Sequence, residues 1–212
     1  MLAAVAGFVD VVGYVTLHHV FTAHMTGNTS KLGLALGRSH LSAALPLAVV
    51  PFLFVAGIAA GTVLADARRR WAALALQAAL VGAYMGYGDT VIRHGTVHGY
   101  SVRGFYVLAA LGTVALGLQS AALTELNGET VRTSYISGVL TNLAQSGVRR
   151  LRGRDDRRRL PRLAATLAVY LGGATLGGFT LPQLSVWCLA IPLAALAAAL
   201  LDRQAGQRTG SV

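Results

Sequence analysis

The sequence predicts an all-α integral membrane protein, and three observations lead to this prediction: its composition, its long apolar stretches and the placement of its arginines. Of its 212 residues, 54% are hydrophobic and 12% are charged, whereas about 25% of the residues of a soluble domain are charged. The mean hydropathy is +0.58. These values exclude an ordinary soluble domain and indicate a chain that is solvated mainly by lipid.

Six apolar stretches approach the ~20 residues that a helix needs to cross the hydrocarbon core of a bilayer. In chain order they are Leu2–Leu17, Leu45–Ala65, Trp71–Ile92, Gly104–Leu123, Leu163–Leu181 and Leu184–Leu201. Two other segments, Met25–Gly37 and Thr133–Val148, are shorter and more polar, so we expect broken or re-entrant helices there. The predicted fold is about six transmembrane helices plus two short ones, in a single membrane domain spanning 1–212.

Matching motifs in the two halves of the chain predict an internal duplication into residues 1–103 and 104–212. Close helix packing by small residues is a competing explanation, because glycine occurs 25 times. The order of the matched features nevertheless agrees along the whole chain. The pairs are Gly7 with Gly117, Thr26-Gly27 with Ser137-Gly138, Gly57 and Gly61 with Gly173 and Gly177, and Trp71 with Trp187.

Arginine placement indicates how the halves are oriented in the membrane. The net charge is +10, with basic clusters at 68–70 and in the loop 149–162. The positive-inside rule places both clusters, and both termini, in the cytoplasm. This is possible if each short segment enters and leaves on one side, so that each half crosses the membrane three times and the repeats are inverted. A rival count of eight spans and parallel repeats would move 68–70 outside, and we favour it less.

Four spaced phrases carry a resemblance to a known family: Gly7–Gly13, Met25–Thr29, Gly117–Gln119 and Arg132–Gly138. The chain resembles the YoaK-like family of bacterial membrane proteins, a domain family of unknown function, over essentially its whole length. The resemblance implies a multi-pass protein of the bacterial inner (plasma) membrane, but it supplies no substrate and no catalytic residue. The chain has Ser120 where the family commonly has asparagine and Ser137 where it tends to have threonine, so no asparagine role carries over to position 120.

The candidate site residues are polar groups in or beside apolar spans. Asp10 lies midway along the first span, where a carboxylate costs about 2.5–3.5 kcal/mol on insertion scales, so a proton-coupling role is one hypothesis and helix packing is the other. Glycine with hydroxyl and amide side chains in the short segments can shape a solute site, and Arg132 offers a counter-charge unless it extends to the surface. The predicted substrate-binding residues are Asp10, Thr26, Gly27, Asn28, Gln119, Arg132, Ser137, Gly138 and Asn142.

These features favour a secondary transporter or channel-like permease for a small polar solute, plausibly anionic and proton-coupled. The alternative is a non-transporting membrane scaffold or partner subunit assembled through glycine ridges. No nucleotide-binding or hydrolase motif occurs, so we expect no enzyme activity, no metal and no cofactor. Expected partners are the small solute and anionic lipid headgroups near 149–162, but no nucleic acid, because the basic run lacks interleaved aromatics. The possibility of a homo-oligomer is left open.

Overall fold

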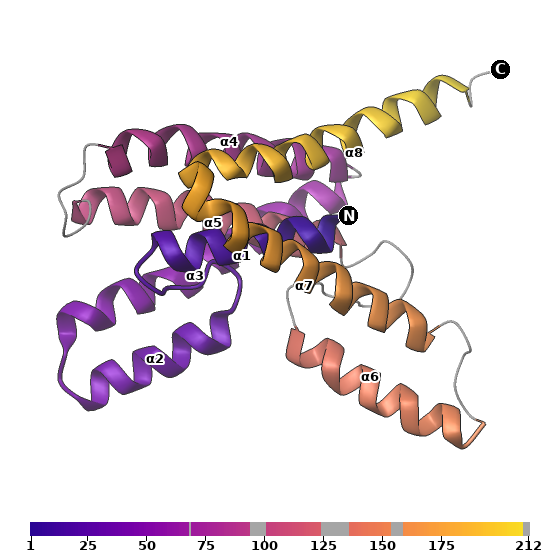
Figure 1. The fold of residues 1–212 in the computed structure, drawn as a ribbon, viewed down its shortest axis with the longest axis horizontal. Helices are drawn as coiled ribbons and strands as arrows, with labels where there is room; N and C mark the ends of the chain where they lie inside the picture. Colours follow the sequence, from indigo (N-terminus) through magenta and orange to yellow (C-terminus); the bar gives the residue numbers. More distant parts are fainter. Residues whose placement is uncertain (68, 94–100, 124–135, 154–158, 210–212) are drawn as a thin grey trace.

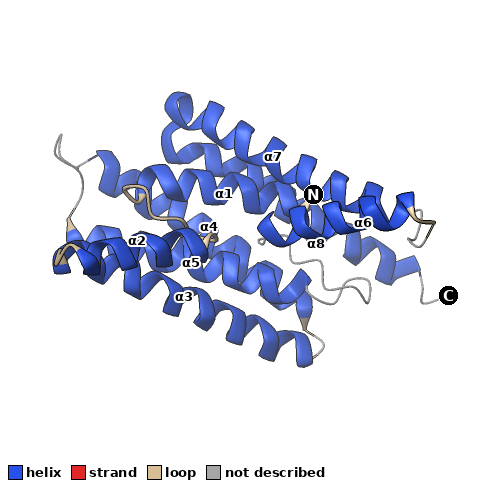
Figure 2. Ribbon diagram, turned by 90° about the horizontal axis from the view of Figure 1, so that it is seen from below, coloured by secondary structure: helices blue, strands red, loops and turns tan. Residues whose placement is uncertain are grey.

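The computed structural model describes the whole chain except residues 68, 94–100, 124–135, 154–158 and 210–212. Every regular element among the described residues is helical (Figure 2). In chain order the elements are α1 (Leu2–Thr16), α2 (Met25–Gly37), α3 (Leu41–Asp66), α4 (Arg70–Arg93), α5 (Val102–Leu123), α6 (Ile136–Leu151), α7 (Arg159–Leu184), the 3₁₀ helix η1 (Ser185–Leu189) and α8 (Ala190–Thr209).

Two parallel helix pairs, α1 with α7 and α3 with α5, form the centre of the molecule. Glycine makes both pairs possible because it lets two backbones meet. A methyl group on Gly173 would strike the Ala4 backbone, and one on Gly57 would strike the Val114 carbonyl oxygen, at 2.5 Å. Helix α4 packs along α5, and α8 lies beside α4 (Figure 1).

The short helices α2 and α6 lie outside this centre, each against one main neighbour. Helix α2 packs on α3, and α6 packs on α7. Figure 1 shows both helices beginning near the middle of the molecule and running toward opposite ends, α2 to the left and α6 to the right. The first turns of α2 and α6 therefore lie at a similar position along the long helices, away from the ends of those helices.

The helix boundaries agree with most of the predicted segments. The segment Met25–Gly37 is α2, and Thr133–Val148 corresponds to α6, which begins at Ile136 and ends at Leu151. The clearest difference lies between the last two spans, where α7 continues to Leu184 and a 3₁₀ turn precedes α8. Ser185 opens that turn with a φ of 51°, a backbone conformation that ends the α7 helix.

Three described helical stretches are long and apolar enough to cross a membrane: Leu41–Asp66, Val102–Ala121 and Arg159–Asp202. The last of these contains α7, η1 and the first part of α8. Helix α1 is apolar but shorter. The structure is therefore that of an all-α membrane protein.

Candidate functional site

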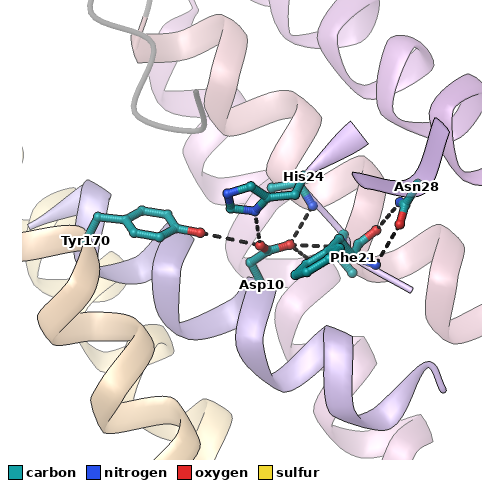
Figure 3. A network of polar contacts seen from close by, with 7 residues as sticks. Asp10, Phe21, His24, Asn28 and Tyr170 are labelled. Carbon is teal, nitrogen blue, oxygen red and sulfur yellow. Dashed lines mark hydrogen bonds and ion pairs between the residues drawn. The ribbon is translucent and has the colours of Figure 1, made fainter. Parts of the chain in front are cut away.

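A buried carboxylate at the middle of α1 organises the polar centre of the protein. Asp10 is 1% exposed, and its neighbours along the α1 surface include Phe8, Val9 and Val12, which are also buried. A carboxylate buried in this way needs hydrogen-bond donors from other parts of the chain. The donors come from the connector 17–24, which joins α1 to α2, and from α7 (Figure 3).

Three donors from the connector converge on one carboxylate oxygen, Oδ1 of Asp10. The backbone N–H groups of Thr22 and Ala23 donate to it at 2.9 and 2.6 Å. The Thr22 hydroxyl donates at 3.1 Å. These bonds hold the end of the connector against the middle of α1, immediately before α2 begins.

The second oxygen, Oδ2, links the connector to the other half of the chain. His24 Nδ1 lies 2.5 Å from Oδ2, and the Tyr170 hydroxyl of α7 donates at 3.3 Å. An ionised carboxylate only accepts hydrogen bonds, so Nδ1 of His24 carries the hydrogen. The His24 side chain is 33% exposed, whereas that of Asp10 is 2% exposed, so this imidazole is the part of the cluster that reaches the surface.

The connector 17–24 is also held by the side chain of Asn28, and it begins with two residues of uncommon backbone conformation. Asn28, which is fully buried, accepts from the Phe21 N–H at 3.0 Å and donates to the Phe21 carbonyl at 2.7 Å. His18 and His19 both have positive φ values, 51° and 66°, which are uncommon for residues other than glycine. The chain reversal after α1 therefore depends on the contacts that neighbouring residues make with the connector.

Lys31 of α2 fixes the outer part of the same connector. Its Nζ donates to the His19 carbonyl and lies over the rings of Tyr14 and Phe21, at 4.9 and 5.0 Å from their centroids. Those two rings stack on each other with centroids 4.4 Å apart. The ammonium group is thus engaged in a cation–π contact and is not directed at Asp10.

Gln119 belongs to a different cluster. It is 2% exposed, donates from Nε2 to the Leu2 carbonyl at 2.7 Å, and accepts from Gln77 Nε2 of α4. Leu2 is eight residues before Asp10 on α1, which corresponds to about 12 Å along a helix. The structure therefore separates Gln119 from the Asp10 cluster and uses it to join α5 to α1 and α4.

The remaining predicted site residues lie on the two short helices. Thr26 is exposed and Gly27 half-buried in the first turn of α2, while on α6 Ser137 is exposed and Gly138 and Asn142 are half-buried. Asp10 and Asn28 are brought together behind the start of α2, but no predicted residue of α6 joins that cluster. Arg132 lies outside the described residues.

Four residues of the polar clusters are absent from the predicted set: Thr22, His24, Tyr170 and Gln77. Thr22 and His24 lie inside a polar interruption between apolar segments, which is a recognisable signal in the sequence. Tyr170 and Gln77 are single polar residues in apolar helices, and only the packing of distant helices shows which groups they meet. Within the described residues no three His, Cys, Asp or Glu side chains are grouped as metal ligands.

The fold and the polar clusters define the chain as a helical membrane protein whose buried acid connects two halves. A family model described as "Protein of unknown function (DUF1275)" matches residues 1–201, and the chain belongs to that family. It is also similar to "UPF0700 transmembrane protein YoaK" of Bacillus subtilis (strain 168), with 25% identity over 202 residues, covering 91% of this chain and 87% of that protein. No solved structure matches the chain. The resemblance to the YoaK-like family is confirmed.

Proposed function

We propose that the protein is a secondary transporter or channel-like permease for a small polar solute, built from inverted repeats with six crossings and two half-helices, α2 and α6. The observation that carries this proposal is the placement of those short helices, which begin near the middle and run to opposite ends (Figure 1). Half-helices that start at the membrane midplane are a recurrent way of building a solute site. Their N-termini carry positive partial charge, which favours an anionic group on the solute.

The glycine contacts support the repeat component of the proposal. Gly57 meets Val114, and its proposed equivalent Gly173 meets Ala4, which is the position equivalent to Val114 when Gly7 is aligned with Gly117. The other contacts correspond in the same way: Gly61 with Leu118 and Gly177 with Phe8, Gly117 with Phe54 and Gly7 with Tyr170. An accidental abundance of glycine does not explain why these backbone partners are also matched.

Polar surface on α2 and α6 supports a water-lined path beside them. Thr26, Thr29 and Ser30 of α2 are exposed, as are Ser137 and Thr141 of α6. Irregular backbone and polar groups at membrane depth are tolerated where they line a water-filled cavity or are covered by protein. We therefore assign solute contact to Thr26 and Gly27 on one side and to Ser137, Gly138 and Asn142 on the other.

The ends of the helices support the expected orientation. The N-terminus, the α3–α4 junction, the end of α6 and the start of α7 all lie toward the right of Figure 1. Arg149 and Arg150 end α6, and Arg159 begins α7. This end is expected to face the cytoplasm and to attract anionic headgroups, at about 1 kcal/mol per basic residue near the surface.

Labelling of single cysteines by a membrane-impermeant thiol reagent tests the proposal. The Cys188→Ser background removes the native thiol, which is buried. We expect Thr26→Cys to react from the outside and Ser137→Cys to react from the cytoplasmic side. Val55→Cys, at an exposed position midway along the long helix α3, is the lipid-facing control and should react from neither. Reaction of positions 26 and 137 from one and the same side would overturn the inverted arrangement.

The scaffold alternative has one observation in its favour, since a pocket that is open to the surface is lined by apolar groups. It has a volume of ≈ 80 Å³ and lies among α1, α7 and α8, lined by Ala4, Phe8 and Ile191 among others. The ridges Gly57/Gly61 and Gly173/Gly177, however, are occupied by α5 and α1 of the same chain. These ridges therefore pack helices of this chain against each other, which does not favour their use in assembly with a partner. If positions 26 and 137 are unreactive from both sides, the scaffold becomes the better explanation.

A further inference from the structure

We propose that His24 and Asp10 form a proton-binding site, in which His24 takes up the proton and Asp10 is its fixed counter-charge. This inference rests on the proposed permease function, where the proton would be the coupling ion. It changes the role given to Asp10 from the sequence. The contacts around the carboxylate carry the argument.

Asp10 is already fully engaged as an acceptor. Thr22 and Ala23 supply three donors to Oδ1, while His24 and Tyr170 supply one each to Oδ2. These five donors take up all of the roughly four lone-pair directions that an ionised carboxylate offers, so no acceptor direction is left free. Protonating Asp10 would require at least one of these groups to leave or to become an acceptor.

His24 is the member of the pair that has room for a proton. Its Nδ1 is held by Asp10, and Figure 3 shows the second ring nitrogen, Nε2, turned away from the carboxylate. The side chain is one-third exposed, and the water-lined path proposed beside α2 would bring water to this ring. A hydronium ion transfers its proton to the Nε2 lone pair: the N–H bond of the imidazolium forms as an O–H bond of hydronium breaks, which leaves water, and release of the proton reverses this transfer.

Among the described groups near the carboxylate, His24 is the one placed to act as the counter-cation of Asp10. Among the described groups packed around this imidazole, Asp10 comes from α1 and Tyr170 from α7, with the His24–Tyr170 ring centroids 6.0 Å apart. The connector adds the Phe21 ring, and α2 adds Lys31, which is held by the His19 carbonyl. A buried charge that loses its partner is strongly disfavoured. Deprotonation of His24 therefore weakens the attachment of the connector to α1.

The sign of the pH effect follows from this arrangement. The attached connector favours the protonated imidazole, so the attachment is strongest at low pH and is lost as the pH rises through the histidine titration. The connector leads directly into α2. Proton release from His24 is thus coupled to the freedom of the first half-helix.

Hydrogen exchange of the intact protein in lipid nanodiscs tests the site. The exchange of the Thr22 and Ala23 amides is followed from about pH 5 to about pH 8 and divided by the intrinsic chemical rate at each pH. We expect the normalised rate of segment 17–24 to rise about tenfold across this range as His24 loses its proton. A normalised rate that does not change with pH overturns the proposal.

Matched variants separate the proton site from simple destabilisation. His24→Asn retains a donor for Asp10 but cannot titrate, so its exchange should be fast and independent of pH. His19→Asn removes the neighbouring histidine, at a positive-φ position that asparagine tolerates, and should retain the transition. Tyr170→Phe removes a neutral donor and should also retain it. The same transition in His24→Asn as in the unmodified protein would refute the assignment.

This outcome is independent of the thiol-labelling result. A permease driven by another ion would show labelling from opposite sides but no pH transition in the connector. A scaffold that binds a proton would show the transition without labelling.

Discussion

Gly173→Ala and Gly172→Ala are adjacent substitutions on α7 for which the structure predicts opposite effects on the free energy of unfolding. The added methyl at 173 would overlap the backbone of Ala4, whereas nothing lies within 4 Å of a methyl at 172. Overpacking of this kind costs about 1–3 kcal/mol. Alanine recovers up to about 1 kcal/mol in a helix relative to glycine, and this gain applies at both positions.

The size of the difference in unfolding free energy depends on which atoms would have to move. At 173 the obstacle is the Ala4 backbone, which cannot rotate away as a long side chain can. We therefore expect Gly173→Ala to be less stable than Gly172→Ala by about 2–3 kcal/mol. The assay is reversible unfolding in mixed micelles, with helix content followed by circular dichroism, and the two variants compared at equal detergent composition.

A second pair of variants tests whether the two halves are equivalent. Gly57→Ala, on α3, meets the Val114 carbonyl and should lose about as much stability as Gly173→Ala. Gly82→Ala, on α4, has nothing within 4 Å of its added methyl and is the control for Gly57→Ala.

For the first pair of variants, equal stability of Gly173→Ala and Gly172→Ala would refute the close approach of α1 and α7.

Three further experiments test the polar clusters. Asn28→Leu leaves both backbone groups of Phe21 unpaired and should cost about 2–4 kcal/mol of unfolding free energy, whereas a cost near zero would show that water replaces the amide. In a double-mutant cycle, Gln77→Leu and Gln119→Leu should be coupled by about 0.6 kcal/mol, and strict additivity would argue against their hydrogen bond. Lys31→Met should lose about 0.5–2 kcal/mol through its cation–π and carbonyl contacts, with Ser30→Ala as the neutral neighbour; an equal effect of the two would contradict those contacts.

The positions of most helices could be predicted from the sequence because apolar length is a local property. The segment Met25–Gly37 was bounded correctly, since Gly37 and the turn at Ser39, with a φ of 56°, end the helix within a few residues. The junction of the last two spans was predicted less well. The run from Leu163 to Leu201 is apolar almost throughout, so hydropathy does not reveal the 3₁₀ turn at Ser185–Leu189.

The site was predictable only in part, because its geometry depends on long-range packing. Asp10 was found from its burial cost alone, as a single acid inside an apolar span. Its partner Tyr170 is 160 positions away in sequence, and no local pattern connects the two. Gln119 was grouped with Asp10 by its place in the repeat, but it lies level with Leu2, near the start of α1. Which side chains meet is decided by helix register, which one sequence does not reveal.

Backbone contact within the two parallel pairs also restricts how the protein can change shape. Only glycine leaves enough room opposite the Ala4 and Val114 backbones, so each pair is held in a register that depends on these glycines. Shear between α1 and α7, or between α3 and α5, is therefore disfavoured, and we expect each pair to move as a rigid body. We expect hinge motion to occur at the turns between helices, such as the one at Ser185. Helices α2 and α6, each held by one main neighbour, are the elements that can swing without breaking this frame.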